Sequence, residues 1–122
     1  EVVDPAHALV GTGFGYDPAE RARQAAVLAQ VLPHIRDIRR IGAAAVDLCG
    51  VACGRLDGYY ERNLKVWDWA AGALIAAEAG AVVGTVDGSP LPEGLPHACI
   101  VAAGPGLFGG LHDLVAAATA AA

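Results

Sequence analysis

The sequence has no concentration of basic residues. Its 8 lysines and arginines are outnumbered by 13 acidic residues, which gives a formal net charge of −5. Nucleic acids and anionic membranes bind to clustered positive charge, so we expect no nucleic acid as the main partner. A metal cation fits this charge balance better.

The sequence also lacks an apolar run long enough to cross a membrane. The longest uninterrupted run, from Trp69 to Ala77, is far shorter than the ~20 residues that span a bilayer. No charged segment followed by an apolar one precedes it, as a leader would require. We therefore expect a soluble protein with no membrane partner.

Cysteine is scarce and odd in number. Three cysteines do not form a disulfide framework, which indicates a reducing, cytoplasmic environment. No His or Cys near Cys49 and Cys53 completes a set of four metal ligands, so we predict that both are small buried side chains. The histidines follow no metal-binding spacing and are predicted to lie in loops and at the surface: His7, His34, His97 and His112.

Methionine is absent, even from the first position, where the chain begins with Glu1. This predicts a fragment or a processed chain whose beginning lies elsewhere. The 122 residues, 55% of them hydrophobic, suffice for one core and are too few for two domains. We expect residues 1–122 to form a single α/β unit.

Strand and helix patterns alternate along the chain. This alternation predicts a layered sheet covered by helices on both faces, with ligand chemistry at strand ends and helix N-termini. Strand character is expected at the beginning of 7–16, ahead of its glycines, and in 35–41, 55–66, 80–86 and 97–104. Helices are expected in 17–32, 43–54, 67–80 and 106–122. At the first helix, Asp17 is the expected N-cap, Pro18 the first helical residue and Glu20 the second half of a capping box.

Two glycine-rich runs follow expected strands. Residues 104–109 match the spacing of a dinucleotide fingerprint, but no second strand and ribose-binding acid follow, so we predict a loop and helix cap. Residues 11–15 lack the Lys and Ser/Thr of a phosphate-binding loop. We expect these glycines to let the backbone come close to another group.

Asp68 lies in the first turn of a helix, 67–80, that is apolar on nearly every side and is therefore expected to be buried nearly all round. One interpretation is that this acid caps backbone N–H groups and complements the helix dipole, a contribution of ~0.3–1 kcal/mol. The other is that an acid in buried surroundings needs a partner, and a hard divalent cation such as Mg²⁺ prefers carboxylate oxygens.

Two more segments point to the same place. Glu61 ends an expected strand and would project toward the N-terminus of that helix, unless it is a solvated acid beside Arg62. The turn at Gly42, Ala43 and Ala44 begins a helix with small side chains only. Its backbone N–H groups would face an anion or a hydroxyl, unless the small residues simply allow close packing.

These residues carry a family resemblance. "WDWAAGALIAAEAG", residues 67–80, resembles the carboxy-terminal Trp-Asp-x-Ala-Ala-Gly signature of the inositol monophosphatase family, and residues 39–61 resemble the segment leading into it. The resemblance implies that Asp68 binds a catalytic Mg²⁺ and contacts substrate. It also implies that Glu61 contacts a substrate hydroxyl and that the backbone of Gly42, Ala43 and Ala44 lines the same pocket.

The chain departs from the family pattern in three ways. Ala43 stands where Ser or Thr is usual, which leaves only backbone contacts there, and Ala81 replaces a frequent second glycine. The family's Glu-rich metal site and its Asp-Pro-x-Asp-Gly-Thr motif have no match. The resemblance therefore implies the carboxy-terminal half of a phosphatase whose amino-terminal half is not in this chain.

The function implied by the resemblance is Mg²⁺-dependent hydrolysis of a small phosphate monoester by a homodimeric enzyme. Inositol monophosphate, yielding inositol and phosphate, is the leading substrate, and magnesium ions would activate water and stabilise the leaving oxygen. Histidinol phosphate, fructose bisphosphate and a phosphorylated nucleotide are alternatives. A non-catalytic, truncated module is an alternative from another class. By itself this chain is expected to be inactive.

Overall fold

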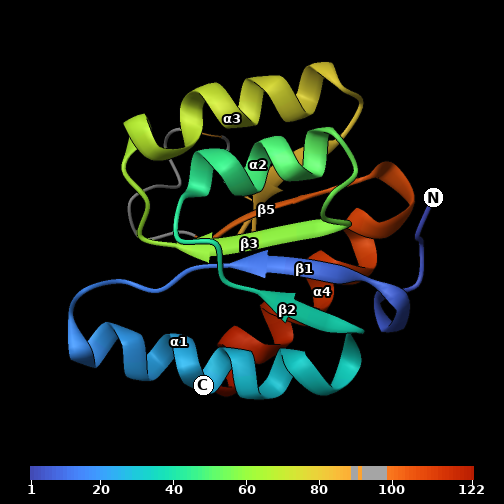
Figure 1. Cartoon of the computed structure of the whole chain (residues 1–122). Helices are drawn as coiled ribbons and strands as arrows, with labels where there is room; N and C mark the ends of the chain where they lie inside the picture. The colour runs from blue at the N-terminus through green and yellow to red at the C-terminus, as the bar shows by residue number, and fades with distance from the viewer. Residues whose placement is uncertain (89–90, 92–98) are drawn as a thin grey trace.

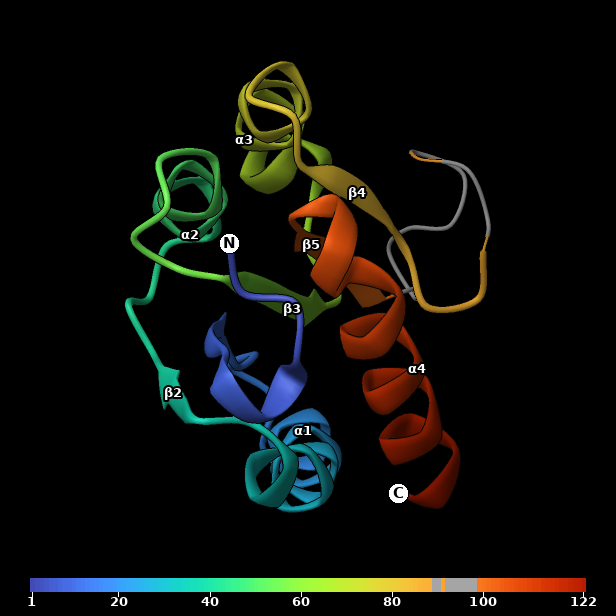
Figure 2. The ribbon, with the colours of Figure 1, turned by 90° about the vertical axis from the view of Figure 1, so that its right-hand side faces the viewer.

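The computed structural model describes residues 1–88, 91 and 99–122, which form a five-stranded sheet between two layers of helices (Figures 1 and 2). The strands are β1 (Leu9–Thr12), β2 (Asp37–Arg39), β3 (Gly58–Arg62), β4 (Val82–Thr85) and β5 (Cys99–Ala103). The helices are α1 (Pro18–Val31), α2 (Ala44–Ala52), α3 (Val66–Glu78) and α4 (Pro105–Ala121), with short 3-10 turns η1 (Pro5–His7) and η2 (Leu32–His34). The expected layered α/β fold is confirmed.

The sheet is mixed, with strand order β2-β1-β3-β5-β4. Strand β1 pairs in parallel with β2 and with β3, whereas β5 runs antiparallel to both β3 and β4. The three parallel strands end on the same side, where α1, α2 and α3 begin (left in Figure 1). This edge is where ligand sites of α/β sheets are found.

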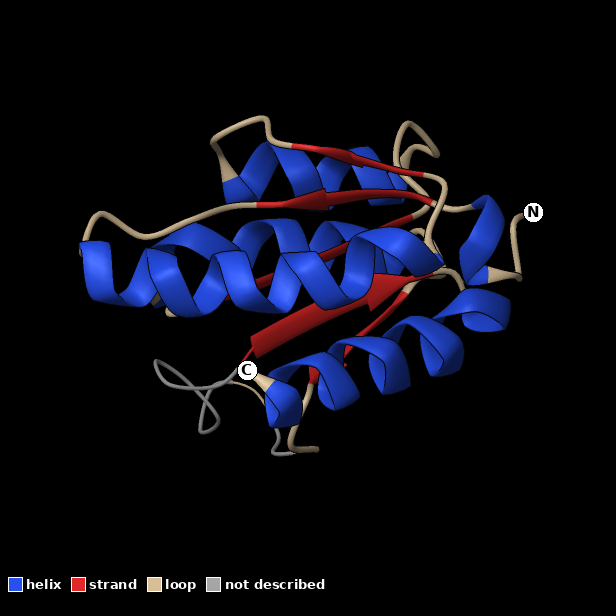
Figure 3. Cartoon of the chain, turned by 90° about the horizontal axis from the view of Figure 1, so that it is seen from below, coloured by secondary structure: helices blue, strands red, loops and turns tan. Residues whose placement is uncertain are grey.

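The chain reverses direction across the sheet, and this places helices on both faces. The step from β1 to β2 moves one way through the sheet, and the step from β2 to β3 moves back. Because parallel crossovers are right-handed, the connecting helices α1 and α2 must lie on opposite faces. Figure 2 shows α1 and α4 on one face and α2 and α3 on the other. Figure 3 shows α1 and α4 in front of the sheet, running roughly along the strands.

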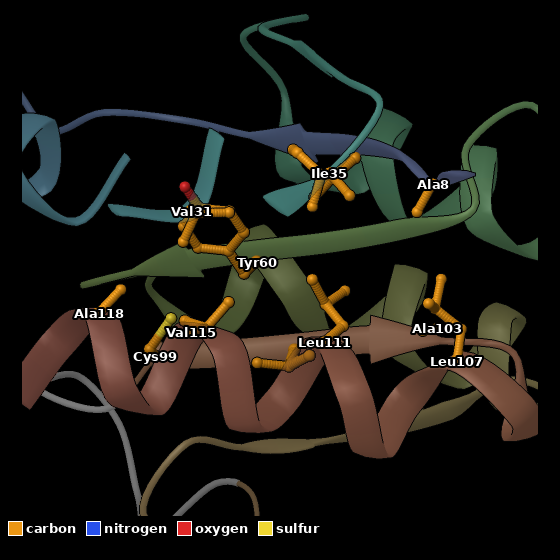
Figure 4. Packing of buried hydrophobic residues seen from close by; sticks show 12 residues of the cluster. Ala8, Val31, Ile35, Tyr60, Cys99, Ala103, Leu107, Leu111, Val115 and Ala118 are labelled. Carbon is orange, nitrogen blue, oxygen red and sulfur yellow. The ribbon is translucent and has the colours of Figure 1, made fainter. Parts of the chain in front are cut away.

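Each face of the sheet has its own apolar core. On one face, α4 presents Leu107, Leu111, Val115 and Ala118, which are spaced at helical intervals and packed against the strands (Figure 4). Burying one such aliphatic side chain contributes roughly 1.5–3 kcal/mol. Because both faces are covered, every residue of β5 is buried.

Helix α3 is buried on one side only, so the expectation of a helix buried nearly all round is wrong. Its inward face consists of Trp69, Gly72, Ala73 and Ala76, at the spacing of a single helical stripe. On the opposite side, the Leu74 side chain is 63% exposed. An apolar composition alone does not say how many layers cover a helix.

Of the two local expectations at the start of α1, one is confirmed and one is corrected. Asp17 does cap α1, accepting a hydrogen bond from the Ala19 N–H at 3.2 Å, but Glu20 does not complete a capping box. The buried Glu20 carboxylate instead accepts from the Arg23 Nη2 at 2.7 Å, and its other oxygen lies 3.6 Å from Arg62 Nε. Attraction to two guanidinium groups prevails over the local cap.

The predictions for cysteine and histidine are partly wrong. Cys53 is exposed and Cys49 half-buried, while Cys99 is buried. His7 and His34 lie exposed on the 3-10 turns, as expected, and His97 is outside the described residues. His112 instead lies on α4, where its Nε2 is 3.1 Å from the Thr85 carbonyl oxygen.

No helix within the described residues is long and apolar enough to cross a membrane.

Candidate functional site

A cleft of about 660 Å³ opens at the edge where the parallel strands end. All five candidate site residues predicted from the sequence line this cleft: Gly42, Ala43, Ala44, Glu61 and Asp68. They come from the turn before α2, the end of β3 and the first turn of α3. The fold thus brings together three segments that are separated in the sequence.

Glu61 is held in place by its neighbours on the sheet. Its Oε1 accepts a hydrogen bond from the Tyr59 hydroxyl at 2.6 Å. Its carboxylate also lies directly over Gly13, where an added Cβ would be 2.6 Å from the Glu61 Cδ. The glycine after β1 therefore makes room for this side chain, as the sequence predicted for the 11–15 run.

The environment of Glu61 alters its proton affinity. Burial raises the pKa of the Glu61 carboxyl, while the Tyr59 hydrogen bond and the Arg40 charge lower it and the Asp68 charge raises it. Burial also raises the pKa of the Tyr59 hydroxyl, so this group stays protonated and donates. The Glu61 carboxylate is therefore oriented by a neutral donor, with its remaining lone pairs available to a ligand.

We expect that Gly13→Ala displaces the Glu61 carboxylate, because the new methyl group would overlap it. In the full-length protein, the affinity for a ligand that contacts Glu61 should fall by about tenfold, which corresponds to ~1.4 kcal/mol. Titration calorimetry with inositol, the alcohol that the sequence resemblance implies, would measure this loss. Gly15→Ala is the matched control, because its nearest neighbour, the Glu20 Cγ, would lie 3.7 Å away. Equal affinities of the two variants would contradict the proposed placement.

Asp68 is the third residue of α3 and caps that helix. Its Oδ2 accepts a hydrogen bond from the Lys65 backbone N–H at 3.0 Å. The capping interpretation made from the sequence is therefore what the structure shows. A carboxylate has two oxygens, so this bond to one of them is compatible with metal ligation by the other.

The turn before α2 exposes backbone rather than side-chain groups to the cleft. Gly42 has φ +93°, a left-handed conformation that suits glycine. Ala43 is the N-cap residue and supplies no side-chain cap, because it has no hydroxyl. The first-turn N–H groups of α2 therefore receive no side-chain cap from Ala43, and such groups are typical donors to anions and to hydroxyl oxygens.

Basic side chains surround the acids, and no periodic pattern of residues indicates them in advance. Arg23, Arg40, Arg62 and Lys65 all line the cleft. The Arg40 guanidinium lies 5.8 Å from the centroid of the Phe14 ring, in cation–π geometry. This mixture of charges suits a ligand that carries both an anionic group and hydroxyls.

One acid near the cleft was missed in the sequence. Asp47 lies in the first turn of α2 and is 1% exposed. Burial, followed by the charge of Glu61, raises the pKa of Asp47 to about 6, and Arg40 opposes this rise. The sequence feature that could have identified Asp47 is that it is the single acid inside the otherwise apolar segment 43–53.

Within the part of the chain that the structure describes, no group of three or more His, Cys, Asp or Glu side chains could hold a metal ion. Asp68 offers one carboxylate at the cleft and Glu61 a second that is already bonded to Tyr59. The described residues therefore fit a part of a magnesium site and not a complete one.

Comparison with known proteins agrees with this picture. An inositol-1-monophosphatase of Mycobacterium leprae is 56% identical over 112 residues, which cover 87% of this chain and 36% of the relative. A Nus factor SuhB of Xylella fastidiosa is 46% identical over 102 residues, covering 79% of this chain and 36% of the relative. The solved structure of Mycobacterium tuberculosis SuhB superposes with a TM-score of 0.84 and 49% identity, covering 97% of this chain and 44% of that one.

The chain spans less than half of the length of these relatives. The model of the inositol monophosphatase family matches residues 2–121, which is nearly the whole chain. On these grounds the chain belongs to the inositol monophosphatase family.

Proposed function

We propose that this chain forms the alcohol-binding side of a Mg²⁺-dependent phosphate monoester hydrolase, with inositol monophosphate as the leading substrate. The observation that carries the proposal is the convergence of Glu61, Asp68 and the bare N-terminus of α2 on one cleft. Membership of the family and relatives named inositol-1-monophosphatase support the same chemistry.

Asp68 is the proposed magnesium ligand. Its cap bond to Lys65 fixes the carboxylate at the mouth of the cleft, and the second oxygen would face the cation. When bound, magnesium would supply a water nucleophile and stabilisation of the leaving oxygen. The remaining carboxylates would come from the amino-terminal half of the full-length enzyme.

Glu61 and the Gly42–Ala44 turn would orient the alcohol part of the substrate. The Glu61 carboxylate, held by Tyr59, is placed to accept a hydrogen bond from a substrate hydroxyl. Backbone N–H groups at the start of α2 would donate to substrate oxygens. Ala43 restricts this contact to the backbone, because it has no side-chain hydroxyl.

The proposal predicts that Glu61→Gln in the full-length enzyme raises KM more than it weakens magnesium binding. A lost charge-assisted hydrogen bond to a hydroxyl is worth ~1.5–3 kcal/mol, or roughly 10- to 150-fold in kcat/KM. The assay compares phosphate esters of inositol, histidinol, fructose and a nucleoside, which differ only in the alcohol. An equal loss on all esters, together with weaker magnesium binding, would instead place Glu61 among the metal ligands.

The same assay separates the candidate substrates. Preference for histidinol phosphate, fructose bisphosphate or a phosphorylated nucleotide would keep the chemistry and change the alcohol. A cytoplasmic homodimer is part of the proposal, and three unpaired cysteines agree with a reducing compartment.

A non-catalytic association module is the second candidate, and the exposed apolar side of α3 favours it. Trp67 is 78% exposed and Leu74 63% exposed, which is unusual for large apolar side chains unless another surface covers them. Absence of magnesium-dependent hydrolysis by the full-length protein on every ester would support this candidate.

A further inference from the structure

Two carboxylates lie over one strand edge, each above a glycine. A Cβ added to Gly11 would be 2.9 Å from the Asp47 Oδ1, and a Cβ added to Gly13 would be 2.6 Å from the Glu61 Cδ. Residues two apart on an extended chain face the same side and are separated by roughly 7 Å. Asp47 and Glu61 are therefore neighbours on the α2 side of the sheet, and the Gly-Thr-Gly run makes room for both.

Asp47 lies behind Glu61 and away from solvent. Its side chain is 1% exposed, and neither of its carboxylate oxygens has a hydrogen-bond partner among the described residues. The Tyr59 hydroxyl, which packs nearby, donates to Glu61 instead. An acid in such a position favours its neutral form, because ionisation would leave a buried charge without a donor.

The charged groups that act on Asp47 come from two neighbouring elements. Glu61 on β3 disfavours its ionisation and Arg40, in the connection from β2 to α2, favours it; with burial as the largest cause, the pKa of Asp47 is about 6. The part of β1 that packs against Asp47 is Gly11, which carries no charge. On α3, Asp68 acts on Glu61. Asp47 therefore changes its charge within the range in which a phosphatase is assayed.

We propose that Asp47 is a positioning residue that sets how strongly Glu61 binds the alcohol part of the substrate. When Asp47 is ionised, a second negative charge behind Glu61 increases the basicity of the Glu61 carboxylate, which strengthens the hydrogen bond that it accepts from a hydroxyl. When Asp47 carries its proton, that bond is weaker. This inference rests on the proposed function, in which Glu61 contacts the alcohol.

The test uses free inositol, which has no titratable group, as an inhibitor of the full-length enzyme between about pH 5 and pH 7.5. We expect its Ki to fall about threefold through pH 6 in the native enzyme. Asp47→Asn keeps the size of the side chain and removes its titration, so this change in Ki should disappear. Asp113→Asn, which neutralises an exposed acid on α4, is the matched control and should retain it. An unchanged pH dependence in Asp47→Asn would overturn the proposal.

A second measurement needs no variant. If ionised Asp47 favours inositol, then bound inositol must favour ionised Asp47 by the same factor. Saturating inositol should therefore move the titration of the Asp47 carboxyl carbon, followed by ¹³C NMR, about half a pH unit lower, which is the threefold effect converted by linkage. A midpoint that inositol does not move would refute the coupling even if Asp47→Asn failed to fold.

The experiments distinguish a failure of the proposed function from a failure of the proposed role of Asp47. If the native enzyme hydrolyses none of the esters, the proposed function fails, but the NMR titration still shows whether Asp47 and bound inositol are coupled. If hydrolysis proceeds and neither Ki nor NMR midpoint responds, only the role of Asp47 is wrong. Unfolding provides a check on the variant: because the pKa of Asp47 in the folded protein exceeds the value of 3.8 expected in the unfolded chain, native stability should decrease as the pH rises from about 4 to about 6, and this decrease should be smaller in Asp47→Asn.

Discussion

Asp68→Asn should lower the turnover of the full-length enzyme by about 100-fold or more and weaken its response to magnesium, while the fold stays nearly intact. The side-chain oxygen of Asn can still accept the Lys65 N–H bond, which Asp68 accepts at 3.0 Å. What the variant loses is the charge that a hard cation requires. Even groups that only support metal ligands typically cost 10- to 100-fold in affinity or activity when removed.

Magnesium-dependence curves and thermal unfolding of both forms would measure these effects. The loss of folding stability should stay within ~1 kcal/mol, the usual contribution of an acid to a helix N-terminus. Glu78→Gln is the matched control, because it neutralises an exposed acid at the other end of α3. A large loss of stability with unchanged magnesium dependence would make Asp68 a cap and nothing more.

The strands and helices could be predicted because local residues mark their ends. Asp17 and Pro18 begin α1, as their capping preferences indicate. Gly104 is the N-cap residue of α4, as the expected cap implies, but residues 105–109 are helical and do not form the expected loop. Alternation of the elements then predicts helices on both faces of the sheet. Strand order, and the antiparallel insertion of β5 between β3 and β4, depend on long-range pairing that no local pattern records.

The segments that line the cleft could be predicted from the sequence. Gly42–Ala44, Glu61 and Asp68 follow strands or begin helices, and such positions meet at one edge of an α/β sheet. The family resemblance proposed their roles, which remain predictions. The geometry adds the Tyr59 hydroxyl, which orients Glu61 and which the sequence alone did not single out.

The acids and bases around the cleft could not be predicted, because their partners are distant in sequence. Glu20 fitted a capping box, yet Arg62, which approaches from β3, lies 3.6 Å from its carboxylate. Asp47 fitted a helical turn, and only the pairing of β1 with β3 places it beside Glu61. Such tertiary contacts decide which charged groups lie together, whereas a helical pattern fixes only which face they share.

Expressed by itself, this chain should show no magnesium-dependent phosphatase activity. Holding magnesium near a phosphate generally takes several carboxylates together with substrate oxygens. Among the described residues no group of three or more candidate ligands exists, and Asp68 supplies a single carboxylate to the cleft. The chain also corresponds to only 36% of the Mycobacterium leprae relative.

If the remaining carboxylates lie in an amino-terminal half, as proposed, adding that half should restore activity and also cover apolar surface. Trp67 and Leu74 on α3 are 78% and 63% exposed, so the isolated chain should aggregate or self-associate, and this tendency should fall when the second half binds. The experiment assays the purified chain with inositol monophosphate and magnesium, alone and after reconstitution, while light scattering follows association. Reconstitution with the Asp68→Asn chain controls for activity carried by the added half. Turnover by the isolated chain at a rate comparable to that of the reconstituted pair would show that the rest of the site does not lie in the other half.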